Sequence, residues 1–169
     1  GKSIWSFSYD CDYFGIGYPA GPRASVVIDA NRAYSLGAMG HLFCFEKGTG
    51  KVIWKRDLNK EYGIRMLTWG ISAAPLIVEN RIILNIGGSD NACVVALDKL
   101  TGEELWRNLE DDASYSAPIL IHQAGQPVIV VWTGQNVVGM NPETGNVYWQ
   151  QEFVQKRMVI NIATPVINN

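Results

Sequence analysis

The chain has 169 residues, which is enough for one sizeable hydrophobic core. Its formal net charge of -2 gives no basic surface of the kind that binds nucleic acid, and its apolar runs are too short to cross a bilayer as a helix. The 17 glycines and 6 tryptophans favour many short strands joined by tight turns. We therefore expect an all-β chain with no nucleic-acid partner and no transmembrane segment.

Alternating apolar runs and turn signals divide the chain into repeated four-strand units. Residues 1–9 are expected to be the last strand of a preceding unit, and residues 10–23 form a loop rich in Tyr, Gly and Pro. Whole units are expected at residues 24–58, 73–109 and 117–153, and residues 161–169 open a further one. The connecting stretch from Asn59 to Gly70 could hold one helical turn, interrupted by Gly63.

The expected strands follow the same plan in each unit. They are Ala24–Asp29, Arg32–Gly37, His41–Glu46 and Lys51–Leu58; Ala73–Val78, Arg81–Ile86, Ala92–Asp98 and Glu103–Leu109; Ala117–His122, Pro127–Thr133, Asn136–Asn141 and Asn146–Phe153; and finally Ala163–Ile167.

One short pattern recurs at the end of every unit. It contains a small residue, an acceptor side chain two positions later, a Thr-Gly pair, and a Trp four positions after the Gly. The full copies run from Cys44 to Trp54, from Ala96 to Trp106 and from Gly139 to Trp149, and Gly1 to Trp5 is a shortened copy. The acceptor can bond turn N–H groups and Gly permits positive φ, so the pattern predicts strand, tight turn, strand. The spacing of 43–52 residues between tryptophans matches a four-stranded propeller blade.

The tryptophans are predicted to join one sheet to the next. An indole is too large to hide inside one small sheet, and burying it stabilises by about 4–6 kcal/mol at most. The indole needs a neighbouring surface, and we expect a small residue at the same level of the adjacent sheet to make room for it. The alternative is a Trp inside the core of its own hairpin. The residues assigned to this docking are Trp5, Trp54, Trp106, Trp149, Gly50, Gly102 and Gly145.

The first strands of the units share a second pattern. Ala73-Ala74-Pro75, Ser116-Ala117-Pro118 and Ala163-Thr164-Pro165 align with one another. Proline at the head of a strand suits an edge whose N–H groups need no partner, and small residues suit crowding around an axis. The innermost strand of a propeller blade is such an edge.

Together these residues resemble the tryptophan-docking repeat of the quinoprotein propellers, the family named for pyrroloquinoline quinone. The string Ala96-Leu97-Asp98-x-x-Thr101-Gly102-x-x-x-Trp106 carries the likeness, which extends over almost the whole chain. It implies an eight-bladed ring, of which this chain is a segment; at about 45 residues a blade, the parent would have about 350–450 residues. The alternative is a ring closed by oligomerisation.

The resemblance implies two kinds of function. Some members are periplasmic alcohol or sugar dehydrogenases that bind the quinone and calcium on the axis, often above an adjacent Cys-Cys disulfide. Others are cofactor-free, such as the outer-membrane assembly lipoprotein of Gram-negative bacteria, which is a docking platform. Here Cys11, Cys44 and Cys93 are isolated. We expect a non-catalytic module for ligand or protein binding, without cofactor or metal, in the periplasm or cell envelope. The alternative is part of a dehydrogenase that uses pyrroloquinoline quinone and calcium in the full-length parent.

Loops at one end of such sheets would surround the mouth of a central channel. Partners expected there are another protein or a small molecule, besides the rest of the chain's own propeller. The candidate contacts are Arg23, Arg65, Trp69, Asp90, Asn91, Tyr115, Gln135 and Asn136. The alternative for each is an ordinary loop residue with local bonds. Trp69 could be a platform for a quinone or simply cover the top of a blade, and the Glu110-Asp111-Asp112 cluster could attract a cation or be a solvated loop.

No catalytic residue is predicted. The only histidines, His41 and His122, fall at opposite ends of their strands and are expected to lie far apart. No nucleophilic triad, metal-ligand spacing or phosphate-binding glycine loop is evident in the sequence.

Overall fold

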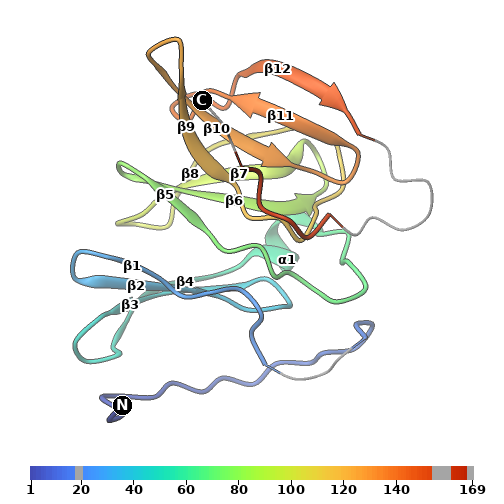
Figure 1. Ribbon diagram of the computed structural model, residues 1–169. Helices are drawn as coiled ribbons and strands as arrows, with labels where there is room; N and C mark the ends of the chain where they lie inside the picture. Colours follow the sequence, from blue (N-terminus) through green and yellow to red (C-terminus); the bar gives the residue numbers. More distant parts are fainter. Residues whose placement is uncertain (18–20, 154–160, 167–169) are drawn as a thin grey trace.

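Three four-stranded antiparallel sheets lie side by side, each with its strands in sequence order (Figure 1). The computed structural model describes residues 1–17, 21–153 and 161–166. The first sheet holds β1 (Val27–Asp29), β2 (Arg32–Leu36), β3 (His41–Glu46) and β4 (Val52–Asp57). The second holds β5 (Leu76–Val78), β6 (Arg81–Gly88), β7 (Ala92–Asp98) and β8 (Glu104–Asn108), and the third β9 (Ile119–Gln123), β10 (Gln126–Trp132), β11 (Asn136–Met140) and β12 (Val147–Glu152). The predicted all-β class and four-strand repeat are confirmed.

One short helix interrupts the strands. It is α1 (Leu58–Tyr62), whose first turn is capped by the Asp57 side chain accepting from the backbone N–H of Lys60 at 3.2 Å. Gly63 ends it in the left-handed conformation, φ 56°. The helical turn expected before Gly63 therefore forms, one residue earlier than predicted.

The innermost strands are shorter than predicted. They begin at Val27, Leu76 and Ile119 rather than at Ala24, Ala73 and Ala117. The residues before them form no ladder, and Pro75 and Pro118 have no N–H to donate. Small and prolyl residues thus lead the chain to each sheet without being part of it.

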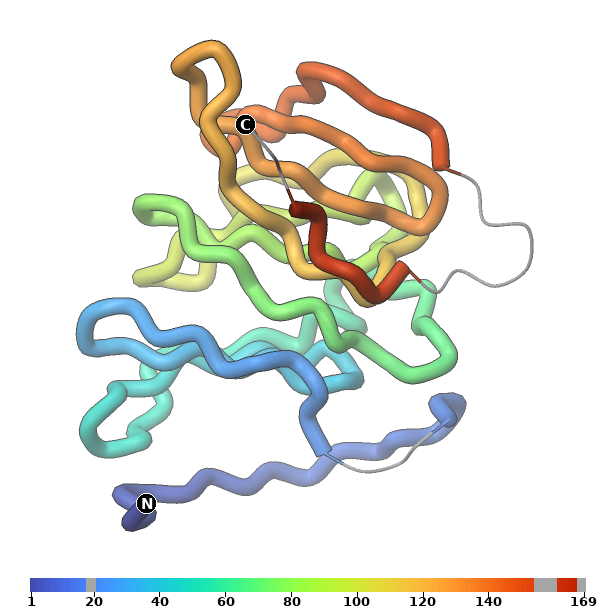
Figure 2. The backbone as a smooth tube through the Cα atoms, viewed as in Figure 1, coloured from blue at the N-terminus to red at the C-terminus, as the bar shows by residue number. Residues whose placement is uncertain are grey.

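The two outer segments make no strand within the described residues. Residues 1–9 run as an extended segment beside the first sheet, separate from its ladder (Figure 2). Residues 161–166 also lack strand pairing, and Ile167 of the predicted strand lies outside the described residues. The assignment of both segments to neighbouring blades stays a prediction.

The repeated turn has the same hydrogen bonds in all three sheets. The backbone carbonyl of the acceptor residue receives the N–H of the turn glycine: Gly50 to Glu46, Gly102 to Asp98 and Gly145 to Asn141, each at 2.8–2.9 Å. The Thr hydroxyl before each glycine accepts the N–H two residues onward, at 3.2–3.3 Å. All three glycines have positive φ, between 73° and 78°. The roles predicted for Thr and Gly are confirmed. The role predicted for the acceptor side chain holds for Asp98 and Asn141, whose Oδ1 atoms accept turn N–H groups at 2.7–3.1 Å, whereas Glu46 accepts the Thr49 hydroxyl at 2.5 Å.

Each of three tryptophans lies on the turn of the following sheet. A Cβ built on Gly50, Gly102 or Gly145 would come within 2.5–2.9 Å of an indole atom of the Trp one repeat earlier. The indole N–H donates to the carbonyl three residues before that glycine. These bonds are Trp5 to Lys47 at 2.7 Å, Trp54 to Lys99 at 3.3 Å and Trp106 to Pro142 at 3.1 Å.

The small residue of the pattern lies opposite the indole of its own sheet. Cys44 pairs across the strand with Trp54, and Ala96 with Trp106, within their own sheets. In the adjacent sheet the turn glycine is the small residue that makes room for the indole, as expected. A β-bulge follows the small residue in every sheet.

Trp149 departs from the other three. Its indole lies over Gly139 of its own sheet, 2.2 Å from where a Cβ would be, and its N–H donates to Gln123 Oε1 at 2.9 Å. No turn of a following sheet covers it among the described residues. The sheet-to-sheet role of Trp149 stays a prediction.

Two apolar clusters fill the spaces between sheets. One joins the first and second sheets through Tyr34, Leu42 and Ile82, and the other joins the second and third through Val94, Trp106 and Ile129. The core therefore lies between sheets, as a docking indole requires.

We predict that Trp106→Ala destabilises the chain by about 3–5 kcal/mol, because the side chain is 9% exposed and fills the second cluster. Trp149→Ala is the control and should cost about 1 kcal/mol, since this indole is half-exposed on its own sheet. Urea unfolding followed by circular dichroism measures both. A cost below about 1 kcal/mol for Trp106 would contradict its burial.

Gly145→Ala isolates the contact between indole and turn. Gly145 and Gly125 share nearly the same φ, 73° and 76°, but a Cβ at Gly125 would have no atom within 4 Å. Both substitutions carry about 1 kcal/mol of backbone strain. Gly145→Ala should cost about 1–3 kcal/mol more, because Trp106 must move. Equal unfolding free energies for the two variants would show that the contact adds nothing.

Candidate functional site

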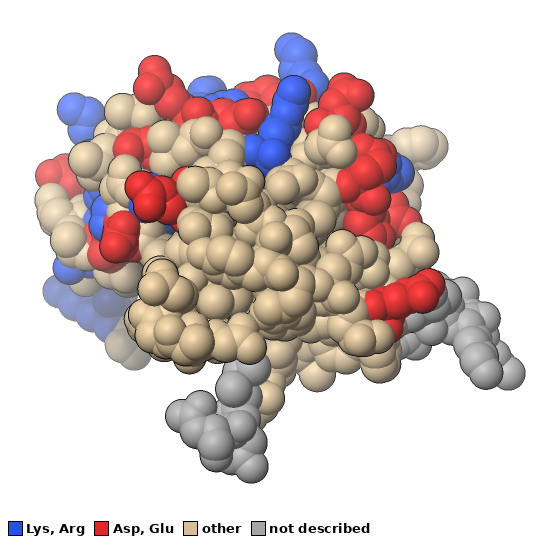
Figure 3. All heavy atoms as spheres, turned by 90° about the horizontal axis from the view of Figure 1, so that it is seen from above, with Lys and Arg blue, Asp and Glu red and all other residues tan. Residues whose placement is uncertain are grey.

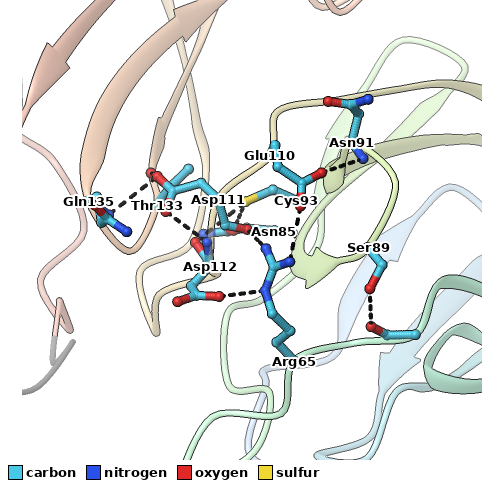
Figure 4. A network of polar contacts seen from close by, with 11 residues as sticks. Arg65, Asn85, Ser89, Asn91, Cys93, Glu110, Asp111, Asp112, Thr133 and Gln135 are labelled. Carbon is cyan, nitrogen blue, oxygen red and sulfur yellow. Dashed lines mark hydrogen bonds and ion pairs between the residues drawn. The ribbon is translucent and has the colours of Figure 1, made fainter.

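Loops from all three sheets meet at the end opposite the glycine turns. They are the stretch after α1, the β6–β7 turn, the segment after β8, and the β10–β11 turn (Figure 4). Backbone bonds tie them together: Arg65 N–H to Gly87 at 3.1 Å, and Gly134 N–H to Asp112 at 2.7 Å. The predicted gathering of these loops at one end is confirmed.

Arg65 is the cation at the centre of this loop cluster. Its Nε donates to Asp112 Oδ1 at 2.6 Å, its Nη1 to Glu110 Oε1 at 3.2 Å, and its Nη2 to the carbonyl of Asp111 at 2.6 Å. Hydrogen bonding to Asp112 raises the pKa of Arg65, against the opposing effect of burial. One guanidinium thus fastens the segment after β8 to the segment after α1.

Glu110 links the same cluster to the β6–β7 turn. Its second oxygen accepts the backbone N–H of Asn91 at 2.9 Å, and this bond, followed by Arg65, lowers its pKa. Asp90 and Asn91 both have positive φ, 56° and 59°, and both side chains are exposed. The turn therefore presents two short polar side chains to solvent beside the Arg65 cluster.

Asp111 organises the β10–β11 turn. Its Oδ2 accepts from Thr133 Oγ1 at 2.5 Å, from Asn136 Nδ2 at 2.8 Å and from the N–H of Gln135 at 3.3 Å. The Asn136 amide oxygen in turn accepts from Gln150 at 2.8 Å. The carboxylate thus binds the third sheet through neutral donors, and the Gln135 side chain remains exposed.

Four buried polar residues beneath this surface were not predicted. They are Asn85, Ser114, Thr133 and Asn161, each 2% exposed or less. Asn85 and Ser114 both donate to the carbonyl of Trp132, and Asn161 donates to that of Thr133 at 2.9 Å. The sequence did contain one signal of this buried polar region. Asn85 is a polar residue inside an otherwise apolar strand, and a buried polar side chain needs a hydrogen-bond partner.

Cys93 belongs to this buried polar region. Its thiol contacts the carbonyl of Asp112 at 3.4 Å, and burial raises its pKa. A buried neutral thiol is chemically inert. All three cysteines are free.

The remaining candidates take part in other contacts. Trp69 and Tyr115 pack together with ring centroids 5.7 Å apart, and the Trp69 backbone N–H donates to the Tyr115 hydroxyl at 3.2 Å. Arg23, half-buried before the first sheet, is close enough to Tyr13 to oppose the rise in that phenol's pKa, which burial causes. The structure thus brings together Arg65, Asn91, Gln135 and Asn136 through the three acidic residues, pairs Trp69 with Tyr115, and places Arg23 near Tyr13.

The acidic cluster is used to hold loops. Glu110 and Asp112 both bind Arg65, whereas Asp111 binds the β10–β11 turn. Over the described residues, no three His, Cys, Asp or Glu side chains are arranged to hold a metal ion. The same residues contain no helix long and apolar enough to span a membrane.

Comparisons with known proteins agree with this architecture. The quinoprotein alcohol dehydrogenase PedH of Pseudomonas putida is 28% identical over 167 residues, covering 93% of this chain and 26% of that protein. The solved quinohemoprotein alcohol dehydrogenase from Comamonas testosteroni matches with a TM-score of 0.60 at 16% identity, over 78% of this chain and 27% of its own. BamB from Moraxella catarrhalis matches with a TM-score of 0.53 at 16% identity, over 77% and 36%.

These likenesses and the three sheets define a β-propeller segment built from quinoprotein-type repeats. A family model described as outer membrane protein assembly factor BamB matches residues 1–169, and the chain belongs to this family of pyrroloquinoline-quinone-type repeats. The chain spans about a quarter of the length of the curated relatives it matches.

The lowered pKa of Glu110 predicts acid sensitivity at the loop cluster. A carboxyl whose folded pKa is depressed adds stability above its unfolded pKa, about 4.3, and loses it as the pH falls through the folded value. Glu110→Gln should therefore be less stable than the parent near pH 6, and the difference should shrink below about pH 4. Urea unfolding between pH 3 and pH 7 measures it. A difference independent of pH would contradict the role of the Glu110 charge.

Proposed function

We propose that this chain is a non-catalytic β-propeller module that binds a protein or a small ligand at the loop cluster. The observation that supports it is the use of the charged side chains there. Arg65, Glu110, Asp111 and Asp112 bind one another or the neighbouring turns. Groups committed to holding three loops in place make a rigid recognition surface rather than a set of acids and bases for chemistry.

The exposed part of the cluster indicates what kind of partner fits. Arg65 and Glu110 keep 41% and 57% of their side-chain surface exposed, and the side chains of Asp90, Asn91 and Gln135 are exposed around them. Such a surface offers hydrogen bonds and both signs of charge with little apolar area. A polar peptide segment or a small polar molecule suits it better than an apolar ligand.

The second candidate is part of a dehydrogenase that uses pyrroloquinoline quinone and calcium. Its support is the 28% identity to PedH over nearly the whole chain. The residues described here do not fit the group well. The Trp69 ring packs against Tyr115, and a Cβ at Gly17 would lie 3.2 Å from the Trp69 ring; these contacts support a role in covering the blade end. The free cysteines provide no adjacent pair.

Location follows from family membership. The name of the matching family model refers to the outer membrane. We infer a periplasmic or cell-envelope location for the protein that carries this chain. Fractionation of cells that produce the tagged protein tests it, and recovery in the cytoplasm would be against it.

A titration with pyrroloquinoline quinone and calcium separates the two candidates. We expect neither saturable quinone absorbance changes nor dye-linked alcohol oxidation, in the 169-residue chain or in a longer protein that contains it. Trp69→Phe is the matched variant, because it keeps a ring against Tyr115. Saturable binding with turnover, weakened by this substitution, would overturn the non-catalytic proposal.

A further inference from the structure

Within the described residues, β12 is the outer edge of the third sheet, as β4 and β8 are of the first and second. An edge strand can pair with an added strand through its outward backbone groups. The Phe153 N–H donates to the carbonyl of Gln135 at 2.7 Å, so Phe153 bonds toward β11. Because this direction alternates along an antiparallel strand, Glu152 and Gln150 turn their backbone groups away from β11. Gln151 Nε2 donates to the Glu152 carbonyl at 3.2 Å, so a donor outside β11 reaches this edge.

The three outer edges differ in charge. β4 carries Lys55 directly after its Trp, and β8 carries Arg107 in the same place, whereas β12 carries Gln150. Glu152 is the only Lys, Arg, Asp or Glu among the residues of β9 to β12. Seen from above, the side on which β12 lies in Figure 1, the molecule shows a broad area without charged residues (Figure 3). Charged side chains protect edge strands against pairing, and the centre of β12 lacks this protection.

Exposed apolar side chains lie at both ends of this edge. Val147 and Tyr148 at the start of β12 are exposed by 39% and 47%, and Phe153, just after it, by 46%. The Tyr148 hydroxyl accepts from Asn141 Nδ2 at 2.7 Å and keeps its own proton to donate. From one end to the other, the edge therefore presents an apolar residue, a hydroxyl donor, an amide, a carboxylate and an apolar residue.

We propose that β12 pairs antiparallel with β12 of a second copy of this chain, about a two-fold axis at Gln150. This register sets Val147 opposite Phe153 of the second copy, and Tyr148 opposite Glu152 of the second copy. Apolar residues then meet apolar residues at both ends, and a hydroxyl donor meets a carboxylate on each side of the axis. The order of residues along this edge is thus complementary to itself.

The residue on the axis suits its own copy. The Gln150 amide donates one N–H of Nε2 to Asn136 Oδ1 at 2.8 Å, and its second N–H can reach the amide oxygen of Gln150 in the second copy. A side-chain amide carries both a donor and an acceptor, so two such groups can face each other without repulsion.

The same pairing is unfavourable at the other two outer edges. Centred on the residue after the Trp, it would set Lys55 against Lys55 of the second copy in β4, and Arg107 against Arg107 in β8. In β8 it would also set Glu104 against Glu110. Like charges directly opposite each other destabilise a strand pair. Of the three outer edges, β12 is therefore the one that accepts its own copy.

A β-bulge keeps the shared ladder short. The register to β11 shifts between Gly139 and Met140, which leaves Tyr148 as the extra residue. Backbone pairing is therefore centred on Gln150 and its neighbours, and side chains make the contacts at either end. A contact along one short strand is small, so we expect a weak dimer with a Kd on the order of 100 µM.

Sedimentation equilibrium of the 169-residue chain from about 10 µM to about 1 mM tests the pairing. Gln150→Lys recreates the charge that β4 carries at Lys55, and it should raise the Kd about fivefold or more, because two ammonium groups would face each other. Gln126→Lys adds the same charge at an exposed position of β10 and is the matched control. It should leave the Kd unchanged.

A disulfide tests the register. Cα atoms of a hydrogen-bonded antiparallel pair lie about 5.5 Å apart, within reach of a disulfide. In a Cys11→Ser background, where the remaining native Cys44 and Cys93 are buried, Gln150→Cys should form a covalent dimer on mild oxidation, and the control Gln126→Cys should not. A monomer at 1 mM, a dimer whose Kd does not respond to Gln150→Lys, or equal disulfide yields at the two positions would each overturn the proposal. The second outcome would assign self-association to another surface.

Discussion

The contact between an indole and a turn glycine fixes how one sheet sits against the next. The ring occupies the space that a Cβ would need, so only glycine fits beneath it. The same glycine closes the turn in the left-handed conformation, which also favours glycine. Two separate requirements, the contact with the indole and the positive φ, therefore select this residue type. The indole N–H bonds a carbonyl of that turn, which sets the ring's position along the turn as well as above it. The buried apolar area of the indole stabilises the contact, and the single hydrogen bond fixes the position of the ring along the turn.

Everything at the other end of the sheets follows from that constraint. Because the sheets are aligned at their turns, the loops after α1, β6, β8 and β10 converge, and Arg65 meets the acidic residues after β8. The space between the first and second sheets is mainly apolar there, with Leu58, Ile64 and Ile86. Between the second and third sheets, Asn85, Ser114 and Thr133 take part in side-chain to backbone bonds. The loop cluster thus lies above a polar seam, which holds its geometry through directional bonds.

The parts of this arrangement that the sequence predicts are those encoded locally. The acceptor, Thr, Gly and Trp residues lie within one hairpin, so their spacing predicts both the turn and the two strands that it joins. The place of Ala96 could not be inferred in the same way. It depends on which residue lies opposite Trp106 after a β-bulge, and a bulge shifts the register without a local signature. The innermost strands were predicted to start too early for a similar reason. Ala73 is small and apolar, as a strand residue can be, but strand pairing depends on a partner across the ladder, and Ala73 has none.

The loop cluster shows where prediction by pattern ends. Arg65, Asn91 and Gln135 were placed together by topology, but their partners were not, because Arg65 and Asp112 lie 47 positions apart and no periodic signal relates them. The acidic run from Glu110 to Asp112 is a single charged patch in the sequence. In the structure, Glu110 and Asp112 bind Arg65, whereas Asp111 binds a neighbouring turn.

Fold and function are therefore encoded in different ways in this chain. The repeated turn and indole build the framework, and they do so whatever the protein binds. Arg65 with its carboxylates lies at the end of the sheets opposite the repeated turns. A repeat that constrains only one end of each sheet leaves the side chains at the other end free for other roles.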